Sequence, residues 1–234
     1  MKKLALFGKE YIDTILFVDG VNGGETNDCN KVVRTRGGLY NFSEVTLPTF
    51  EATPLTSGLK KAYIISDSSL SKRTSFVLNL KESILSSGIC NKINDECDWL
   101  HVCYLDDIEC HKDVLGITIP YSLDFCTDKS RQPYLEALKR STIVFDSRER
   151  KQLYIDIIID TPIILHDEFG FEIIKNGKII FKRDIQPIEG LNVNGAGDMY
   201  AANFIKNYEE FGLFKSATMA MIDTTNILVK KENS

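Results

Sequence analysis

The sequence predicts a single α/β domain built on a central, mostly parallel sheet. Short apolar runs alternate with amphipathic stretches, which is the pattern of strands joined by crossover helices. The length of 234 residues fits one large domain, and 43% hydrophobic with 26% charged residues is typical of a globular protein. A chain of this size buries about 70% of its unfolded surface, so it needs neither disulfides nor a metal for stability. No internal repeat or linker divides residues 1–234.

Seven apolar runs predict the strands of this sheet. They lie at 4–7, 12–17, 62–65, 99–105, 117–121, 142–145 and 163–166. The amphipathic stretches between and after them predict helices, and these lie at 79–87, 133–139, 148–157, 196–208 and 215–228. The alternation of the two kinds of segment is what favours a parallel sheet over an antiparallel one.

Two further segments carry turn signals. Asn176-Gly177 lies between apolar runs in residues 171–181, and both residues tolerate the positive φ of a type I′ turn, so a hairpin is expected there. Residues 19–35 are polar and glycine-rich, which suits a protruding β lid, with 52–66 as a possible second part. A plain surface loop is the alternative for 19–35.

The charge balance excludes several classes of partner. The chain carries 28 basic and 33 acidic residues, a net charge of −5, with no basic block, so nucleic acid is not expected to bind. The apolar residues after Lys2 and Lys3 are interrupted by Lys9, Glu10 and Asp13, which does not fit a signal peptide. No apolar stretch is long enough to cross a bilayer. We therefore expect a cytoplasmic protein with no membrane partner.

The cysteines raise the question of a metal site. None of the six forms a Cys-x-x-Cys pair, and free thiols are expected in a reducing compartment. His101 and Cys103 share one face of a predicted strand, but Cys110 and His111 are adjacent and would point apart in an extended segment. Because zinc requires four converging ligands, we favour thiols and imidazoles in or near the core over a zinc site.

The segment Asn194-Gly-Ala-Gly-Asp198 carries the strongest chemical signal. Gly195 and Gly197 remove side chains where a loop enters a helix, so backbone N–H groups can approach a negatively charged oxygen. Asp198 would lie in the first turn, where a carboxylate can accept a proton from a hydroxyl group. An ordinary helix start stabilised by an aspartate is the alternative.

Two other glycine-loop patterns do not fit this segment. A dinucleotide-binding loop needs a third glycine where Tyr200 stands. A P-loop needs Gly-Lys-Ser/Thr, and that triplet does not occur in the chain. The remaining chemistry is an anion-binding helix start next to a carboxylate, which is what phosphoryl transfer requires.

Five motifs together resemble those of the ribokinase-like (PfkB) carbohydrate kinases. Residues 192–198 resemble the second signature, Asp-Thr-x-Gly-Ala-Gly-Asp, and 36–41 resemble the first, Gly-Gly-x-x-x-Asn. Residues 4–13 are similar to the opening strand with its glycine and aspartate, and 18–26 to the Pro-Gly-Glu-Thr lead into the lid. Residues 146–149 resemble the Asn-x-x-Glu element. The order and spacing agree through nearly the whole chain.

The resemblance implies a three-layer α/β/α fold with a small β lid, and a kinase that uses ATP and Mg²⁺. Its substrate would be a hydroxyl of a sugar or nucleoside-like small molecule. Asp198 would be the catalytic base, and the anion hole would be Asn194, Gly195, Ala196 and Gly197. The substrate would contact Asp13, Gly37, Gly38 and Asn41, while Glu149 and Asp146 would position Mg²⁺ through water. Lids of this family sometimes pair between subunits, which implies a possible homodimer.

The chain also departs from the family pattern. Arg36 replaces a glycine, Asn192-Val193 replaces Asp-Thr, and Asp146 replaces an asparagine. Asp167 would lie near the nucleotide, and the chain is short after Asn41, where a helix and a strand normally follow. These changes motivate an alternative, a catalytically weak relative that binds a sugar or nucleotide as a sensor or interaction module. A third possibility is an unrelated α/β enzyme with a chance match.

Overall fold

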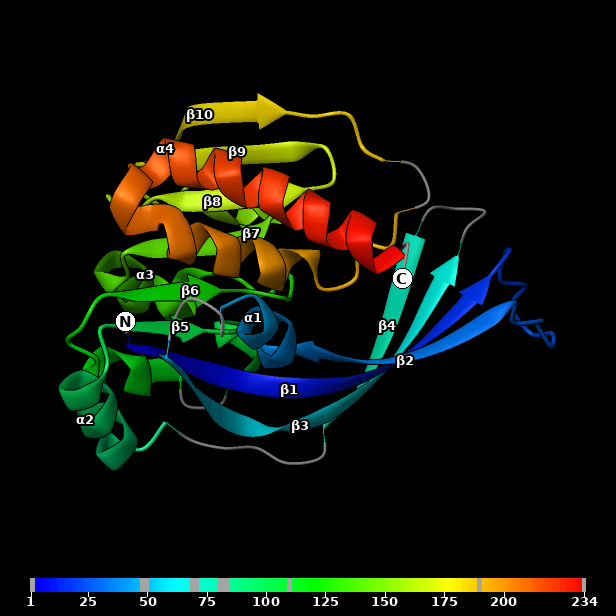
Figure 1. Ribbon diagram of the computed structural model, residues 1–234, viewed down its shortest axis with the longest axis horizontal. Coiled ribbons are helices and arrows are strands. Elements are labelled where there is room, and N and C mark those ends of the chain that lie inside the picture. Colours follow the sequence, from blue (N-terminus) through cyan, green and yellow to red (C-terminus); the bar gives the residue numbers. More distant parts are fainter. Residues whose placement is uncertain are drawn as a thin grey trace.

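A computed structural model describes residues 3–46, 51–67, 72–79, 85–108, 111–188 and 191–232. These residues form a ten-stranded mixed sheet with helices on both faces (Figure 1). The strands are β1 (Lys3–Val18), β2 (Lys31–Gly38), β3 (Glu51–Asp67), β4 (Lys72–Asn79), β5 (Trp99–Val102), β6 (Tyr121–Asp124), β7 (Ile143–Ser147), β8 (Ile163–Asp167), β9 (Gly170–Lys175) and β10 (Lys178–Asp184).

The strand order is β10-β9-β8-β7-β6-β5-β1-β3-β4, and β2 pairs with β1. Strands β3, β1, β5, β6, β7 and β8 run parallel. The hairpin predicted at Asn176-Gly177 is confirmed, since β9 and β10 are antiparallel and both turn residues have positive φ. The central sheet is therefore mostly parallel, as the sequence predicted, with antiparallel strands at both edges.

The helices are α1 (Leu39–Thr46), α2 (Ser87–Glu96), α3 (Leu135–Arg140) and α4 (Ala196–Glu232). The last one breaks at Gly212, with φ 69° and ψ −175°, so it comprises the two helices predicted at 196–208 and 215–228. Short 3₁₀ segments follow several strands, and they cover Leu105–Asp107, His111–Gly116, Gln132–Tyr134 and Arg148–Tyr154.

Alternation along β1 explains why the helices form two layers. Leu4 and Leu6 pack in one cluster with α1 and α4 side chains such as Phe42 and Phe204. The neighbouring residues Ala5 and Phe7 pack on the other face with α2 and α3. Successive side chains of a strand point to opposite faces, so this short run supplies both hydrophobic cores. The three-layer α/β/α architecture is confirmed.

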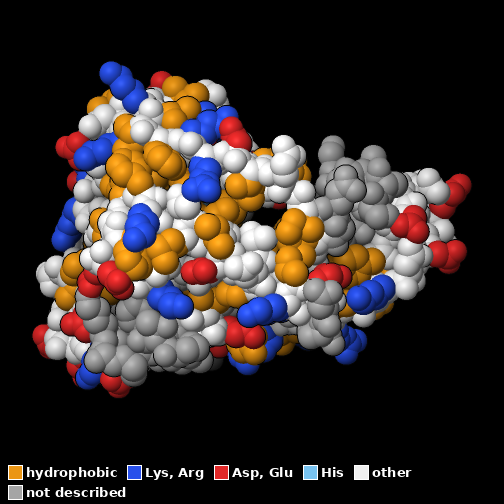
Figure 2. All heavy atoms as spheres, turned by 45° about the horizontal axis from the view of Figure 1, so that its top comes forward, with side chains coloured by type: hydrophobic (Ala, Val, Ile, Leu, Met, Phe, Trp, Pro, Cys, Tyr) orange, Lys and Arg blue, Asp and Glu red, His pale blue; other side chains and the backbone are white. Residues whose placement is uncertain are grey.

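Strand β1 changes partners along its length, and this creates an arm. Residues 4–7 pair with β5, whereas residues 10–17 pair with β2, and the pairing with β3 shifts register between Gly8 and Glu10. The outer parts of these strands, residues 10–38, 59–67 and 72–79, extend away from the body (Figures 1 and 2). We call these residues the β arm. Ile15, Ala62 and Ile64 form its small core.

Several element boundaries differ from the prediction. The runs 4–7 and 12–17 are one strand, β1, and the run 99–105 stops at Val102. The strand predicted at 117–121 is wrong: β6 begins at Tyr121, because the Ile117 N–H donates to Val114 O and its side chain fills the helical layer. An apolar run shows that its residues are buried, but buried residues occur both in the sheet and in the helical layers that cover it. The run at 117–121 therefore did not identify a strand.

Two predicted helices also differ. At 79–87, β4 continues to Asn79 and α2 begins only at Ser87, where the Ser86 hydroxyl caps its first turn; residues 80–84 lie outside the described residues. The segment predicted at 148–157 is a 3₁₀ helix that ends at Tyr154. The strand predicted at 62–65 is the end of a much longer strand, β3, which begins at Glu51. The strands at 142–145 and 163–166 and the helix at 133–139 lie where expected, within a few residues.

Two of the candidate zinc ligands are core residues, and His111 is half-buried against the Tyr134 ring. His101 and Cys103 are buried; the His101 ring stacks on Phe42 at 4.1 Å and its Nδ1 lies 2.8 Å from Ser122 Oγ. Burial lowers the pKa of His101 to about 3, so the ring is neutral. Cys110 lies outside the described residues, among which no group of three metal-ligating side chains occurs. The described helices include none whose length and apolar content would let it cross a membrane.

Candidate active site

Asp198 is buried in the first turn of α4, and two neutral side chains hold its carboxylate. Asn41 of α1 donates from Nδ2 to Oδ2 at 3.0 Å. The Tyr104 hydroxyl, just beyond β5, donates to Oδ1 at 2.7 Å. Only 3% of Asp198 is exposed, so a catalytic base there would work in a setting largely shielded from water.

The predicted substrate residues lie next to this carboxylate. Asp13 of β1 is buried, and Asn194 donates to its Oδ2 at 3.4 Å. Gly37 and Gly38 end the antiparallel partner strand β2; a Cβ on Gly37 would lie 2.6 Å from Asp13 Oδ2. Because Gly37 has no side chain, the backbone of β2 can lie close to the Asp13 carboxylate of its partner strand β1. The structure brings both signature motifs and Asp13 into one site.

Gly195 explains why the loop before α4 needs glycine. Its φ is +77°, in the left-handed region, and a Cβ would lie 2.3 Å from Asn41 Nδ2. Any other residue would therefore combine an unfavourable backbone conformation with a clash against the amide that holds Asp198. Glycine at this position is required by both the turn and the site.

The backbone amides at the start of α4 are not equivalent. The Ala196 N–H donates to Val193 O at 3.1 Å, which closes the turn. Neither Gly195 nor Gly197 has a hydrogen-bond partner for its N–H within the described part of the chain. The two glycine amides, together with the positive end of α4, are thus the best placed donors for an anion.

A cleft of about 670 Å³ passes over this helix start. It runs along the carboxyl ends of β6, β7 and β8, where ligands of open parallel sheets bind. Its polar lining includes Tyr104, Asp124, Asp146, Glu149, Arg150, His166, Asp167 and Asp198. This volume is within the range of small-molecule sites, and the cleft is large enough for a nucleotide.

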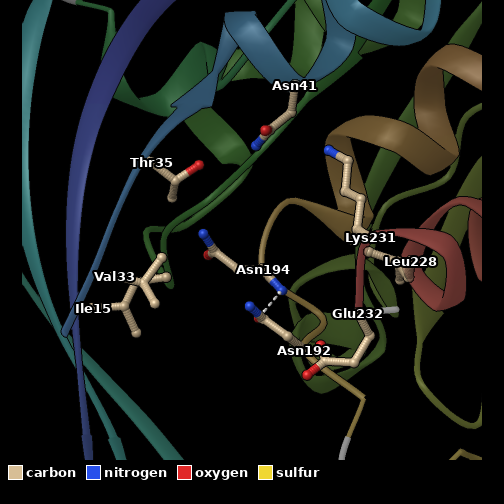
Figure 3. Close-up of a pocket in the computed structure, with 9 residues that line it drawn as sticks. All are labelled: Ile15, Val33, Thr35, Asn41, Asn192, Asn194, Leu228, Lys231 and Glu232. Carbon is tan, nitrogen blue, oxygen red and sulfur yellow. Dashed lines mark hydrogen bonds between the residues drawn. The ribbon is translucent and has the colours of Figure 1, made fainter. Parts of the chain in front are cut away.

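A smaller cavity of about 110 Å³ lies on the other side of the loop, between the β arm and the end of α4 (Figure 3). Thr35, Asn41, Asn192 and Asn194 supply its polar lining, and an Asn194 N–H···Oδ1 Asn192 bond of 3.1 Å holds the loop. The remaining lining comes from Ile15, Val33, Leu228, Lys231 and Glu232. Asn41 lines this cavity and also donates to Asp198, which lines the large cleft, so Asn41 connects the two spaces.

Two site residues were not found from the sequence. Asp124 ends β6 and is buried; burial, followed by the charges of Asp198 and Asp146, raises its pKa well above the ordinary value. A polar residue at the carboxyl end of a parallel strand indicates a binding site. Because the strand was predicted at 117–121 and not at 121–124, Asp124 was not recognised as such a residue. Tyr104 gave no signal, because nothing local distinguishes it from a core tyrosine.

Asp146 lies in the cleft but does not fit the predicted role of a magnesium ligand. Arg150 and the Ser147 N–H donate to its Oδ1, and Arg131 and Tyr154 donate to its Oδ2 at 2.7 and 2.5 Å. Oδ1 therefore accepts two hydrogen bonds and Oδ2 three, since Arg131 Nε also donates to Oδ2 at 3.3 Å, and two guanidinium groups balance the charge. Magnesium would have to displace these donors.

Glu149 does line the cleft, at the start of the 3₁₀ segment Arg148–Tyr154. Its carboxylate fits a magnesium ion held through water, because Mg²⁺ keeps several waters and needs few protein ligands. Asp167, which the sequence placed near a polyphosphate, accepts from Arg148 at 3.0 Å. The repulsion expected from Asp167 is thus reduced by an ion pair.

Solved structures of several kinases resemble this chain. Thermotoga maritima ribokinase is 12% identical with a TM-score of 0.69, covering 96% of this chain and 92% of that chain. Arabidopsis thaliana ribokinase complexed with ribose and ATP is 12% identical with a TM-score of 0.71, covering 96% and 91%. Methanocaldococcus jannaschii nucleoside kinase is 16% identical with a TM-score of 0.64, covering 96% and 90%.

By sequence, no protein-family model and no curated protein matches the chain. The likeness is therefore one of structure, and it extends over nearly the full length of both chains in each comparison. The chain has the ribokinase-like α/β fold.

Proposed function

We propose that this protein is a kinase that transfers the γ-phosphoryl group of ATP to a hydroxyl of a sugar or nucleoside-like small molecule. One observation carries the proposal. The Asp198 carboxylate lines the large cleft at the start of α4, beside two glycine amides, and Asn41, which donates to it, lines the small cavity. A base, an anion-binding helix start and two adjoining spaces are the parts that in-line phosphoryl transfer needs.

Asp198 accepts the proton of the acceptor hydroxyl as its oxygen attacks the γ-phosphorus. A bond forms between this oxygen and phosphorus, and the bond from phosphorus to the bridging oxygen of ADP breaks. The N–H groups of Gly195 and Gly197 stabilise the charge on the transferring group. The acceptor occupies the small cavity, where Asn41 hydrogen-bonds one of its other hydroxyls. Asp13, which accepts from the cavity residue Asn194, hydrogen-bonds another. The β arm acts as the lid over this cavity.

Glu149 would hold Mg²⁺ through water in this proposal, and the ion would supply positive charge to the nucleotide phosphates. Arg150 lies in the same cleft and adds a fixed positive charge, although it also pairs with Asp146 at 2.5 Å. The neighbours of known structure support the nucleotide assignment, since one was solved with ribose and ATP and another with ADP.

The test is turnover of ATP against a panel of sugars, sugar phosphates and nucleosides. Wild type is expected to turn over at least one acceptor, and Asp198→Asn to lower kcat by about 10²- to 10⁴-fold. Glu136→Gln, which alters an exposed surface ion pair, is the matched control and should leave kcat unchanged. Full activity of Asp198→Asn would refute the proposed base. Saturable binding without turnover would favour a sensor or interaction module.

A homodimer through the β arm belongs to the same proposal. Strand β4 is an edge strand on which Phe76, Val77 and Leu78 are 58%, 45% and 52% exposed. Exposed apolar edge strands pair readily with another copy. Phe76→Glu should give a monomer in sedimentation, whereas Ile158→Glu, at another exposed apolar residue, should leave the mass unchanged. An unchanged mass in Phe76→Glu would exclude this interface.

A further inference from the structure

Tyr104 is unusual both in its backbone and in its contact. Its φ of 61° and ψ of 64° place it in the left-handed region, which bulky residues rarely adopt. Its hydroxyl lies 2.7 Å from Asp198 Oδ1 across 94 positions of sequence. A residue held in a strained conformation next to a candidate base indicates a role at the site.

We propose that Tyr104 is a positioning residue for Asp198, which fixes the orientation of the carboxylate for proton transfer. The inference rests on the kinase function proposed above and adds to it a residue that none of the sequence motifs contains. Tyr104 acts through Asp198 and does not itself exchange the proton.

Each of the two carboxylate oxygens of Asp198 has its own neutral donor. Asn41 donates to Oδ2, and Tyr104 donates to Oδ1. The donors come from α1 and from the end of β5, two elements that meet only in the folded chain. A carboxylate held at both oxygens cannot rotate freely.

The position of Tyr104 is itself determined by the base of the β arm. Its ring makes an edge contact with Tyr11 of β1, with centroids 5.8 Å apart and planes at 75°. The Tyr11 hydroxyl donates to Asp107 at 2.7 Å, and Asp107 pairs with Lys60 of β3. Two strands that continue into the arm therefore support the ring that orients the base.

Tyr104 also keeps its proton. Burial, and then the charge of Asp198, raises the pKa of Tyr104 well above its ordinary value. The hydroxyl is consequently a donor throughout the working range of pH. Because a phenol at this distance could instead compete with the acceptor for Oδ1, the experiment has to distinguish positioning from competition.

The test compares Tyr104→Phe with Tyr121→Phe, using the acceptor that wild type phosphorylates. Tyr121 is also buried and donates to Ala137 O, but it lies in the opposite core and not in the cleft. Positioning predicts that Tyr104→Phe lowers kcat by about 10- to 100-fold, the effect of one hydrogen bond to a charged group, with KM within twofold. Tyr121→Phe should change neither constant by more than about twofold.

Three results would overturn the role. Unchanged kcat and KM in Tyr104→Phe would show that Tyr104 does not position Asp198. A lower KM with equal or higher kcat would show that Tyr104 competes with the acceptor for Asp198. A raised KM with unchanged kcat would show that Tyr104 contributes to substrate binding. Wild type without turnover on any acceptor would overturn the proposed function and this role with it.

A double-mutant cycle supplies a readout that does not need activity. If Tyr104 holds the carboxylate, the unfolding equilibrium constants of Tyr104→Phe and Asp198→Ala should be non-additive by about tenfold. Additivity of the two substitutions would show that the contact is absent in solution and would overturn the proposal even if kcat fell.

Discussion

Asp198 and Asp146 are both buried aspartates in the same cleft, and both were expected to serve the reaction, but their surroundings differ. Neutral donors, Asn41 and Tyr104, hold Asp198. Arginines hold Asp146: Arg131 is itself buried, and its guanidinium also pairs with Asp106. Guanidinium groups favour the charged form of a carboxylate, which suits Asp146 to a structural role, whereas the neutral donors around Asp198 suit the base proposed above. The partners, not the residue type, separate the two roles.

The largest expected effect tests this contrast through stability. Asp146→Asn should lower the free energy of unfolding by about 3 kcal/mol or more, because it leaves the buried Arg131 guanidinium with less opposing charge. Asp198→Asn keeps the shape of the side chain, and its donors Asn41 and Tyr104 are neutral, so its effect should stay within about 1 kcal/mol. Urea unfolding of both variants measures the difference. Equal losses would mean that Asp198 is also a structural anchor.

The second effect concerns the loop that carries Asp198. Gly195→Ala should cost about 1–2 kcal/mol for its positive φ and more for the clash with Asn41, and it should lower turnover at least tenfold. Gly24→Ala is the matched control, since Gly24 has φ +83° and a Cβ at this position would meet no atom within 4 Å. Gly24→Ala should lower the free energy of unfolding only by the cost of its positive φ, and its turnover should equal that of wild type. If the two variants were alike, the close approach to Asn41 would not matter.

The third effect is a pH dependence caused by Asp124, the neighbour of both aspartates. Its pKa is raised in the folded protein, so the folded state binds more protons than the unfolded one above about pH 4. Stability therefore falls as pH rises from there to the folded-state pKa, by about 1.4 kcal/mol for each pH unit. Asp124→Asn should be more stable than wild type at about pH 7–8, with the advantage shrinking toward about pH 4, as urea unfolding across this range would measure. A pH-independent difference would contradict the raised pKa.

The smallest effect concerns the ion pair between Arg148 and Asp167 at the rim of the cleft. Asp167→Asn should change KM for ATP by less than about threefold, because a partly exposed pair contributes little. Arg148→Met leaves Asp167 and Glu172 without this cation and should raise KM for ATP more than Asp167→Asn does. Steady-state kinetics at fixed acceptor concentration checks both. A large loss in Asp167→Asn would assign that carboxylate a direct part in nucleotide binding.

Sequence patterns predicted the parts that depend on neighbours along the chain. Apolar residues in β1 are buried on both faces of the sheet, and Asn176-Gly177 favours a tight turn. The α/β architecture and the hairpin could therefore both be predicted from the sequence. The glycines before Asp198 likewise reflect a local need for positive φ and close approach. The ribokinase-like fold followed from the order of such motifs.

Local sequence patterns did not distinguish strands from segments of the helical layers, because both bury apolar side chains. The run at 117–121 is apolar because it covers the sheet, and this displaced the expected strand by several residues and concealed Asp124. Likewise, Arg150 and Asp146 are close in sequence, but nothing in that spacing indicates that Arg131 would occupy the opposite side of the same carboxylate.

The sequence by itself determined the fold class, the helix start at Asp198 and the candidate chemistry, because each depends on periodicity or on backbone conformations that only certain residues adopt. Only the tertiary structure decided which carboxylate is neutralised and which is held by Tyr104. That choice depends on side chains 15 to 157 positions apart, which meet at one edge of the sheet once its strands are stacked. Hydrogen bonds and charges act over a few ångströms in space, whatever their separation along the chain.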